Sequence, residues 1–202
     1  MPPLRVQLLD FSRRAIEIIK ANTAFDPKHM DVAQTCLVTQ PIPFEPLIAK
    51  YCTFIFTMSA ISPEHHSRVV KKVYDQVAPG GLLYFRDYGK YDLGQIRLAK
   101  KANAKLKENF YVCTDKTRRY YFTIEEIRKL FCGGGDDGAE FECIELGNIY
   151  KVAEHRTDDK LMHRIWVQAK FRKPATKPIV KKKESDNDIS DLFPPFGAAS
   201  KR

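Results

Sequence analysis

The sequence lacks the features of a membrane protein, a zinc protein or a disulfide-stapled protein. Its 202 residues contain no apolar run approaching the ~20 residues of a membrane helix, and the start does not have the pattern of a secretory signal. The five cysteines are odd in number, widely spread and never in a CxxC pair. We therefore expect free thiols, no metal site, no membrane contact and a reducing, cytoplasmic location.

Glycine is also missing from the first part of the chain, where the first one is Gly80. No glycine-rich cradle for a phosphate or a cofactor therefore precedes residue 80. The glycine-rich stretch "CGGGDDG" (132–138) follows a predicted helix instead of a strand, so we interpret it as a flexible connection.

What the chain has in excess is positive charge, with a formal net charge of +9. Residues 86–129 carry 12 Lys and Arg against 6 Asp and Glu, and this aromatic-rich segment favours a polyanionic partner such as nucleic acid. The polar residues 173–202 are expected to form a disordered basic tail. Its run 181–183, "KKK", could serve nuclear import, and a solubilising role is the alternative.

Strand and helix signals alternate along residues 1–172, which we expect to form one domain. Strands are predicted at 5–10, 31–38, 51–58, 82–87, 139–147 and 162–171, and helices at 12–22, 62–78, 91–107 and 123–131. The run "YCTFIFTM" (51–58) is apolar throughout, as in a parallel strand buried on both faces. The sequence predicts an α/β fold, with helices on both faces of the sheet.

Ligands of such sheets bind at the carboxyl ends of the strands. Asp10 ends the first predicted strand, where a carboxylate can accept hydrogen bonds from both hydroxyls of a ribose, although it could also only cap the next helix. The segment "TMSAIS" (57–62), with Ser59, would let a flat ligand approach the backbone or form a plain loop. The segment "RDYGKYD" (86–92) delivers charged and aromatic groups to the same edge.

Several segments together resemble one known family. They are, in order, "DFSRRAIE", "IFTMSAIS", "APGGLLYFRDYGKYD", "ENFYV", "TRRYYFT" and "HRIWVQAKFRKP". Over about residues 5–174 the sequence is similar to the tRNA 3-methylcytidine methyltransferases of the methyltransferase-like family. The resemblance implies a Rossmann-like class I fold, mostly parallel with an antiparallel late strand. It also implies S-adenosylmethionine as cofactor and N3 of a cytidine in the tRNA anticodon loop as target.

The same resemblance implies a set of cofactor-binding residues. Asp10 matches the family's ribose-binding acid, with Phe11 and Ser12 beside it, and Ile55 matches a residue that lines the cofactor site. A second acid, in a "CDL" motif that meets the adenine amino group, falls at Cys36 and Leu37, where this sequence reads "TCL". The contact to adenine therefore departs from the family pattern.

Catalytic and RNA-binding residues are expected in the basic segment. Asp87, with Arg86 and Tyr88 beside it, is the candidate to stabilise the positive charge of a methylated cytosine, unless it only pairs with an arginine. Tyr91, Phe110 and Tyr111 could stack on an extruded base or lie in the core. Phosphate contacts are expected from Arg97, Lys101, Arg118 and Arg119, of which the first two would share a helix face with Lys105. A solvated amphipathic helix is the alternative.

The family's fold begins with a strand and a GxGxG loop that have no counterpart here. That strand lies between those matching residues 5–10 and 51–58, so these two are expected to pair directly or to leave unpaired backbone groups. We interpret the sequence as an N-terminally shortened member. The competing hypothesis is a non-catalytic fold that binds tRNA or a protein. An aminoacyl-tRNA synthetase or another protein is a further expected partner.

Overall fold

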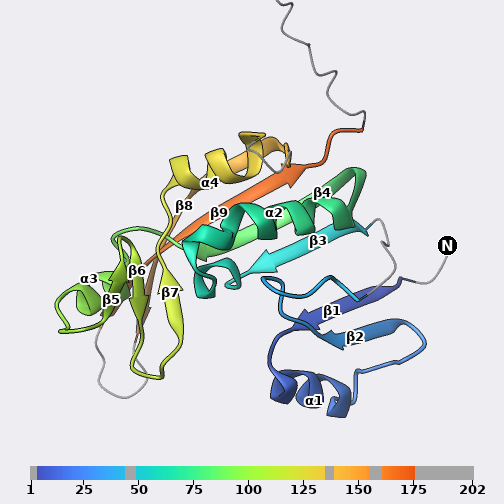
Figure 1. Ribbon diagram of the computed structural model, residues 1–202, viewed down its shortest axis with the longest axis horizontal. Coiled ribbons are helices and arrows are strands. Elements are labelled where there is room, and N and C mark those ends of the chain that lie inside the picture. The colour runs from blue at the N-terminus through green and yellow to red at the C-terminus, as the bar shows by residue number, and fades with distance from the viewer. Residues whose placement is uncertain (1–3, 44–48, 135–138, 155–160, 176–202) are drawn as a thin grey trace, which may run out of the picture.

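The computed structural model describes residues 4–43, 49–134, 139–154 and 161–175 (Figure 1). Most of the predicted tail, from residue 176 on, lies outside them. No helix among these residues is both long enough and apolar enough to cross a membrane.

The N-terminal part forms a β-α-β unit. Strand β1 (Val6–Asp10) pairs in parallel with β2 (Met30–Gln34), and α1 (Arg13–Ala21) connects them. The Ser12 hydroxyl accepts a hydrogen bond from the Ala15 N–H at 3.3 Å, so Ser12 caps α1 as its sequence position predicts.

The central sheet has four strands, in the order β3-β4-β9-β8, and its strands are β3 (Ala49–Ile55), β4 (Val77–Tyr88), β8 (Glu142–Glu154) and β9 (Leu161–Arg172). Strand β3 is parallel to β4, whereas β9 is antiparallel to both of its neighbours. This arrangement confirms the mostly parallel sheet with an antiparallel late strand. Among the described residues β1 and β3 belong to separate sheets. The direct pairing of these two strands, which was one of the two expected arrangements, therefore does not occur.

One face of the central sheet is covered by two helices, α2 (His66–Gln76) and α4 (Ile124–Cys132), as Figure 1 shows. Two short 3₁₀ turns, η1 (Met58–Ala60) and η2 (Pro63–His65), precede α2. Val69, Val70 and Val73 are buried on α2, whereas Val77, which the predicted helix 62–78 includes, begins β4. Thr123 and Glu126 form the capping box that starts α4.

The opposite face of the central sheet is open in the described part of the chain. Tyr51 and Ile55 on β3 and Tyr84 on β4 are exposed there. The prediction that residues 51–58 are buried on both faces, under helices on both sides, is therefore wrong for this part of the molecule. An apolar run does not by itself distinguish burial on one face from burial on two.

Residues 93–120 form a small unit with a sheet of its own, made of α3 (Leu93–Ala99) and the strands β5 (Lys105–Lys107), β6 (Phe110–Val112) and β7 (Arg118–Tyr120). The predicted helix 91–107 is wrong beyond Ala99. Asn103 has a φ of 61°, in the left-handed region that a helix cannot contain, and Lys105 lies in β5 opposite Tyr111. Arg97, Lys101 and Lys105 therefore do not share one helix face.

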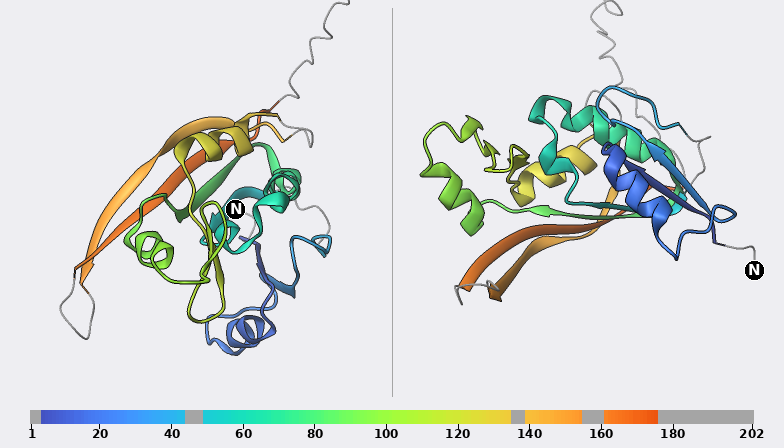
Figure 2. Two further views of the ribbon diagram at one scale, coloured as in Figure 1. Left: turned by 60° about the vertical axis from the view of Figure 1, so that its left-hand side comes forward. Right: turned by 90° about the horizontal axis from the view of Figure 1, so that it is seen from below.

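The main core lies between the helix-covered face and α2 and α4, and it contains Phe54, Phe85, Phe131 and Phe171. A smaller cluster of Leu98, Ala104, Tyr111 and Tyr121 holds α3 against its sheet. Strands β8 and β9 continue beyond the central sheet as a two-stranded arm (Figure 2).

Candidate functional site

Asp10 lies where the parallel-sheet rule places a ligand group, at the carboxyl end of β1. One of its carboxylate oxygens, Oδ1, accepts a hydrogen bond from the Ser12 N–H at 2.7 Å. The neighbouring Phe11 side chain is exposed, and its backbone carbonyl accepts a hydrogen bond from Gln34 at 3.1 Å. Asp10 is partly exposed, so its carboxylate is accessible for the hydroxyls of a ribose.

Cys36 and Leu37 follow β2. Hydrogen bonds from the Thr39 side chain and backbone lower the pKa of the Cys36 thiol, and the Cys36 N–H donates to Gln40 at 2.8 Å. Leu37 packs against the main core, and its carbonyl accepts a hydrogen bond from Lys72. The structure thus holds this segment in place with internal contacts, and a thiol stands where the family pattern has a carboxylate.

The chain leaves β3 through a strained residue that the sequence did not reveal. Phe56 has a φ of 49°, which is uncommon for a bulky side chain, and its N–H donates to the Arg86 carbonyl at 2.8 Å. Its partly exposed ring contacts the rings of Tyr88 and Trp166, with centroids 5.0 and 5.6 Å away. Sequence carries no signal for this conformation, because nothing in the residue type favours it.

Asp87 is fully buried beneath the end of β4. Its carboxylate accepts hydrogen bonds from the backbone N–H groups of Ser59 and Tyr88, each at 2.9 Å. Burial raises the pKa of Asp87 to about 6, and the hydrogen bonds from Ser59 and Tyr88 oppose that rise. Asp87 therefore fixes η1 to β4, and Ser59, which is also buried, takes part through its N–H. The catalytic role of Asp87 and the cofactor contact of Ser59 remain predictions.

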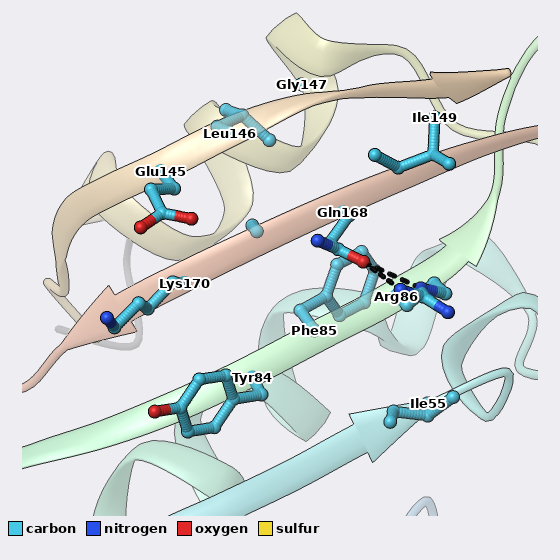
Figure 3. A pocket seen from close by; sticks show the side chains of 11 residues that line it. Ile55, Tyr84, Phe85, Arg86, Glu145, Leu146, Gly147, Ile149, Gln168 and Lys170 are labelled. Carbon is cyan, nitrogen blue, oxygen red and sulfur yellow. Dashed lines mark hydrogen bonds between the residues drawn. The ribbon is translucent and has the colours of Figure 1, made fainter.

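Arg86 points to the open face of the sheet. Its guanidinium donates to the Gln168 side-chain carbonyl and lies 5.5 Å from the centre of the Trp166 ring. It therefore does not form the pair with Asp87 that the sequence left open. Arg86 and Gln168 line a shallow hollow of about 720 Å³. Figure 3 shows them there together with Ile55 of β3 and Tyr84 of β4.

Tyr88 is enclosed by cations and aromatic rings. The guanidinium of Arg119 lies 4.3 Å from the centre of the Tyr88 ring, and that of Arg164 lies 5.5 Å from it. The ring also contacts Phe56 and Tyr121. These contacts hold the small β5-β6-β7 unit against β4 and β9.

Asp92, at the end of the "RDYGKYD" segment, has a structural role that sequence reasoning missed. It is fully buried, and its Oδ1 accepts a hydrogen bond from the Gly94 N–H at 2.7 Å. Its Oδ2 accepts from Arg164 Nε at 2.8 Å and from the Ile165 N–H at 2.9 Å. Asp92 thereby caps α3 and ties it to β9. A signal was present, since Asp is a preferred N-cap, but the partner on β9 is 72 residues away.

The three aromatic residues predicted to stack on RNA differ in exposure. Tyr91 is 68% exposed, whereas Phe110 and Tyr111 are 2% and 6% exposed. Phe110 packs in the main core and Tyr111 against Tyr121. Burial leaves Phe110 and Tyr111 too little surface to stack on a base, so the core alternative holds for them, and Tyr91 stays a candidate.

The predicted phosphate-binding residues lie on the small β5-β6-β7 unit and on α3. Arg97, Lys101 and Arg118 are exposed, and Lys101 donates a hydrogen bond to Thr114 at 3.2 Å. Arg97 and the half-buried Arg119 line one hollow of about 300 Å³. The turn after α3 thus brings Arg97, Arg119 and, through Thr114, Lys101 to one hollow, although not by the helix repeat that predicted it. Arg118 precedes Arg119 on β7, so its side chain points to the other face.

In the described part of the chain no three His, Cys, Asp or Glu side chains are grouped so that they could hold a metal ion.

Comparison with known proteins identifies several relatives that are named for one reaction. No family model matches the chain. It is 39% identical over 175 residues to the tRNA N(3)-methylcytidine methyltransferase Mettl2 of Drosophila melanogaster, covering 86% of this chain and 52% of that protein. It is 37% identical over 172 residues to trm140 of Schizosaccharomyces pombe, with the same enzyme name, covering 84% and 53%. The chain thus spans about half the length of the curated relatives it matches.

The fold has counterparts among solved structures. A SAM-dependent methyltransferase from Methanosarcina mazei superposes with a TM-score of 0.63 at 16% identity, over 85% of this chain and 83% of that one. This match shows the class I methyltransferase fold, as the sequence predicts. The identities above bear out the predicted resemblance: over 84–86% of its length the chain is similar to about half of each of two tRNA N(3)-methylcytidine methyltransferases.

Proposed function

We propose that this chain takes part in S-adenosylmethionine-dependent methylation of N3 of a cytidine in the anticodon loop of tRNA. The observation that carries the proposal is the similarity to relatives named for this reaction, at 37–39% identity over 84–86% of the chain. The competing hypothesis, a non-catalytic fold that binds tRNA or a protein, has no observation that specifically favours it.

The residues at the strand ends fit part of a cofactor site. S-Adenosylmethionine, when bound, supplies an electrophilic methyl group. Asp10 offers carboxylate oxygens to its ribose hydroxyls, and the exposed Phe11 and Ile55 side chains offer apolar surface near the ends of β1 and β3. Cys36 offers a thiol beside the adenine in place of a carboxylate. The described residues hold these groups without a glycine-rich loop.

Methyl transfer to N3 of cytosine does not require a general base to activate the nucleophile. N3 of cytosine is neutral and unprotonated at pH 7, so its lone pair can attack a methyl group without prior loss of a proton. Alignment of the reacting atoms then provides most of the rate enhancement. The product base is cationic, and the carboxylate of Asp87 contributes negative potential beneath the end of β4 when it is ionised.

The exposed cations position the RNA. Arg97, Lys101 and Arg118 are available for phosphate oxygens, and Arg119 holds Tyr88 while lining the same hollow as Arg97. Tyr91 presents its ring to solvent from a left-handed backbone position, with a φ of 69°. It is the best placed of the predicted aromatic residues to stack on a base.

The first test is calorimetric titration of S-adenosylmethionine into the 202-residue chain and its Asp10→Ala variant. Saturable binding that the variant loses would support the cofactor site. Asp31→Ala is the matched control, because Asp31 lies on β2 and pairs with Arg5 at the surface. Binding that survives Asp10→Ala would remove Asp10 from the site.

The second test separates an enzyme from a binding module. Methylation of unmodified tRNA is followed by nucleoside mass spectrometry for 3-methylcytidine, and tRNA affinity is measured at fixed salt. Combined Arg97→Glu and Lys101→Glu should weaken tRNA binding by about tenfold or more. Lys71→Glu, a charge reversal on α2, is the control. Strong tRNA binding with no cofactor binding and no 3-methylcytidine would favour the non-catalytic hypothesis.

Partner and location follow as part of the same proposal. An aminoacyl-tRNA synthetase or another tRNA-bound protein would be a suitable partner, tested by co-purification with and without RNase. The cytoplasm is the proposed location, with nuclear import through residues 181–183 as the alternative. Imaging of a tagged chain with these lysines replaced would distinguish the two.

A further inference from the structure

The outer edge of β8 is a long strand edge with no partner among the described residues. Strand β8 is the last in the order β3-β4-β9-β8, and Figure 3 shows it on the outer side of β9. Its exposed side chains include Ile149, Tyr150 and Val152. A long strand edge with apolar side chains is a template for pairing with another strand.

In the described part of the chain, only one end of this edge has a feature that would prevent pairing with another strand. A register shift between Cys143 and Glu145 places a bulge at the start of β8. From Glu145 onward the pairing with β9 is regular through Lys151 and beyond. The regular segment 145–151 therefore presents the backbone N–H and C=O groups of every second residue along its free side.

The segment 145–151, "ELGNIYK", is complementary to itself when a second copy runs antiparallel about Asn148. Glu145 of each copy is then opposite Lys151 of the other, so two ion pairs form by symmetry. Leu146 is opposite Tyr150, an aliphatic against an aromatic side chain. Residues directly opposite in an antiparallel pair share one face, so these contacts are sterically consistent.

Two observations within one chain favour this register. Across β9, Lys151 is opposite the basic Arg164, which itself pairs with Asp92, so that position of β9 offers Lys151 no acid, whereas Glu145 of another copy would. A Cβ placed on Gly147 would meet nothing within 4 Å, so there is open space beside it. In the antiparallel register, Ile149 of the second copy lies opposite Gly147 and can fill that space.

We infer that two copies of this chain form a dimer by antiparallel pairing of their β8 edges over residues 145–151. The two four-stranded sheets then become one continuous eight-stranded sheet with a two-fold axis at Asn148. This inference is independent of the proposed methyl transfer, since it uses no residue of the cofactor or RNA sites.

The test is sedimentation equilibrium of the 202-residue chain over a wide concentration range. A monomer–dimer equilibrium is expected. Glu145→Lys alone and Lys151→Glu alone each create two like-charge contacts and should raise the dimer dissociation constant by about tenfold. An equimolar mixture of the two variants restores both opposite-charge contacts, so it should recover the wild-type dimer as a heterodimer.

The controls separate this interface from general association. Glu17→Lys, the same charge change on α1, should leave the dimer unchanged, and circular dichroism should show that every variant is folded. A chain that stays monomeric at all concentrations would overturn the inference. So would single variants that dimerise like the wild type, or a mixture that associates no better than either variant alone.

Discussion

The two faces of the central sheet differ although they are built by the same strands. On β4, Leu83, Phe85 and Asp87 lie on the helix-covered face and are almost completely buried, whereas Tyr84 and Arg86 between them lie on the open face. Phe85 is 1% exposed and Tyr84 is 38% exposed. Folding free energy is thus concentrated on one face, and the other presents side chains that further contacts can use.

The largest expected effect tests this difference directly. Phe85→Ala removes a ring that packs against Phe54, Phe122 and Phe131, and should lower the free energy of unfolding by about 3–5 kcal/mol. Tyr84→Ala, one residue away, should lower it by less than about 1 kcal/mol. Urea unfolding of both variants measures this. Equal losses would mean that the open face is covered in solution.

Asp92 joins the small β5-β6-β7 unit to the arm. Asp92→Ala leaves Arg164 and two backbone N–H groups without their buried acceptor, so a loss of about 3 kcal/mol is expected. Asp75→Ala, which removes only an exposed pair with Lys71 on α2, is the matched control and should have little effect. A loss no greater than that of the control would show that α3 and β9 are held together by packing alone.

The buried carboxyl of Asp87 predicts a pH dependence. Burial raises its pKa to about 6 in the folded state, so between about pH 4 and 6 the folded protein binds more protons than the unfolded chain. The resulting stabilisation, on the order of 3 kcal/mol, is complete below about pH 4 and is lost as the pH rises through 6. Asp87→Asn should remove this slope, which urea unfolding at several pH values would detect. A slope of the same size in the variant would assign the effect to another group.

The smallest expected effect concerns the start of α4 on the covered face. Glu126 accepts hydrogen bonds from the Thr123 N–H and from the Tyr120 hydroxyl, each at 2.7 Å. Glu126→Ala should lower the free energy of unfolding by about 1 kcal/mol, as expected for the loss of a helix cap. Glu125→Ala, at the exposed neighbouring position, is the control. Thermal unfolding of both variants measures the difference. A larger effect of the control would contradict the capping argument.

Most long elements were predictable because their signals are local. Alternation, an apolar stripe, an N-cap or a capping box defines β1, α1, α2, α4, β8 and β9 within short windows of sequence. The strands β5, β6 and β7 were not predicted, since three residues each give no period to detect. Their pairing depends on left-handed turns at Asn103, Asn109 and Lys116.

The place of the candidate site in the fold was predictable from the sequence, but the burial and the contacts of its side chains were not. The rule that ligands bind at carboxyl ends of strands pointed to Asp10 and Asp87, and both lie at such ends, of β1 and β4. Ile55 was predicted from the family resemblance. The rule could not show that Asp87 is fully buried against η1, or that Arg86 turns to Gln168 on the open face. These facts depend on partners 28 and 82 residues away, which no local pattern encodes.

The separate pairing of β1 with β2 has a consequence for dynamics. Between residues 4 and 43 only Ile16 and Thr35 are buried, so this unit has little apolar contact to resist local opening. We expect its amide hydrogens to exchange with solvent much faster than those of β4 and β9. Asp10 lies in this unit, so only molecules in which the unit is folded can bind a ligand at Asp10. The apparent affinity for that ligand therefore decreases as the folded fraction of the unit decreases.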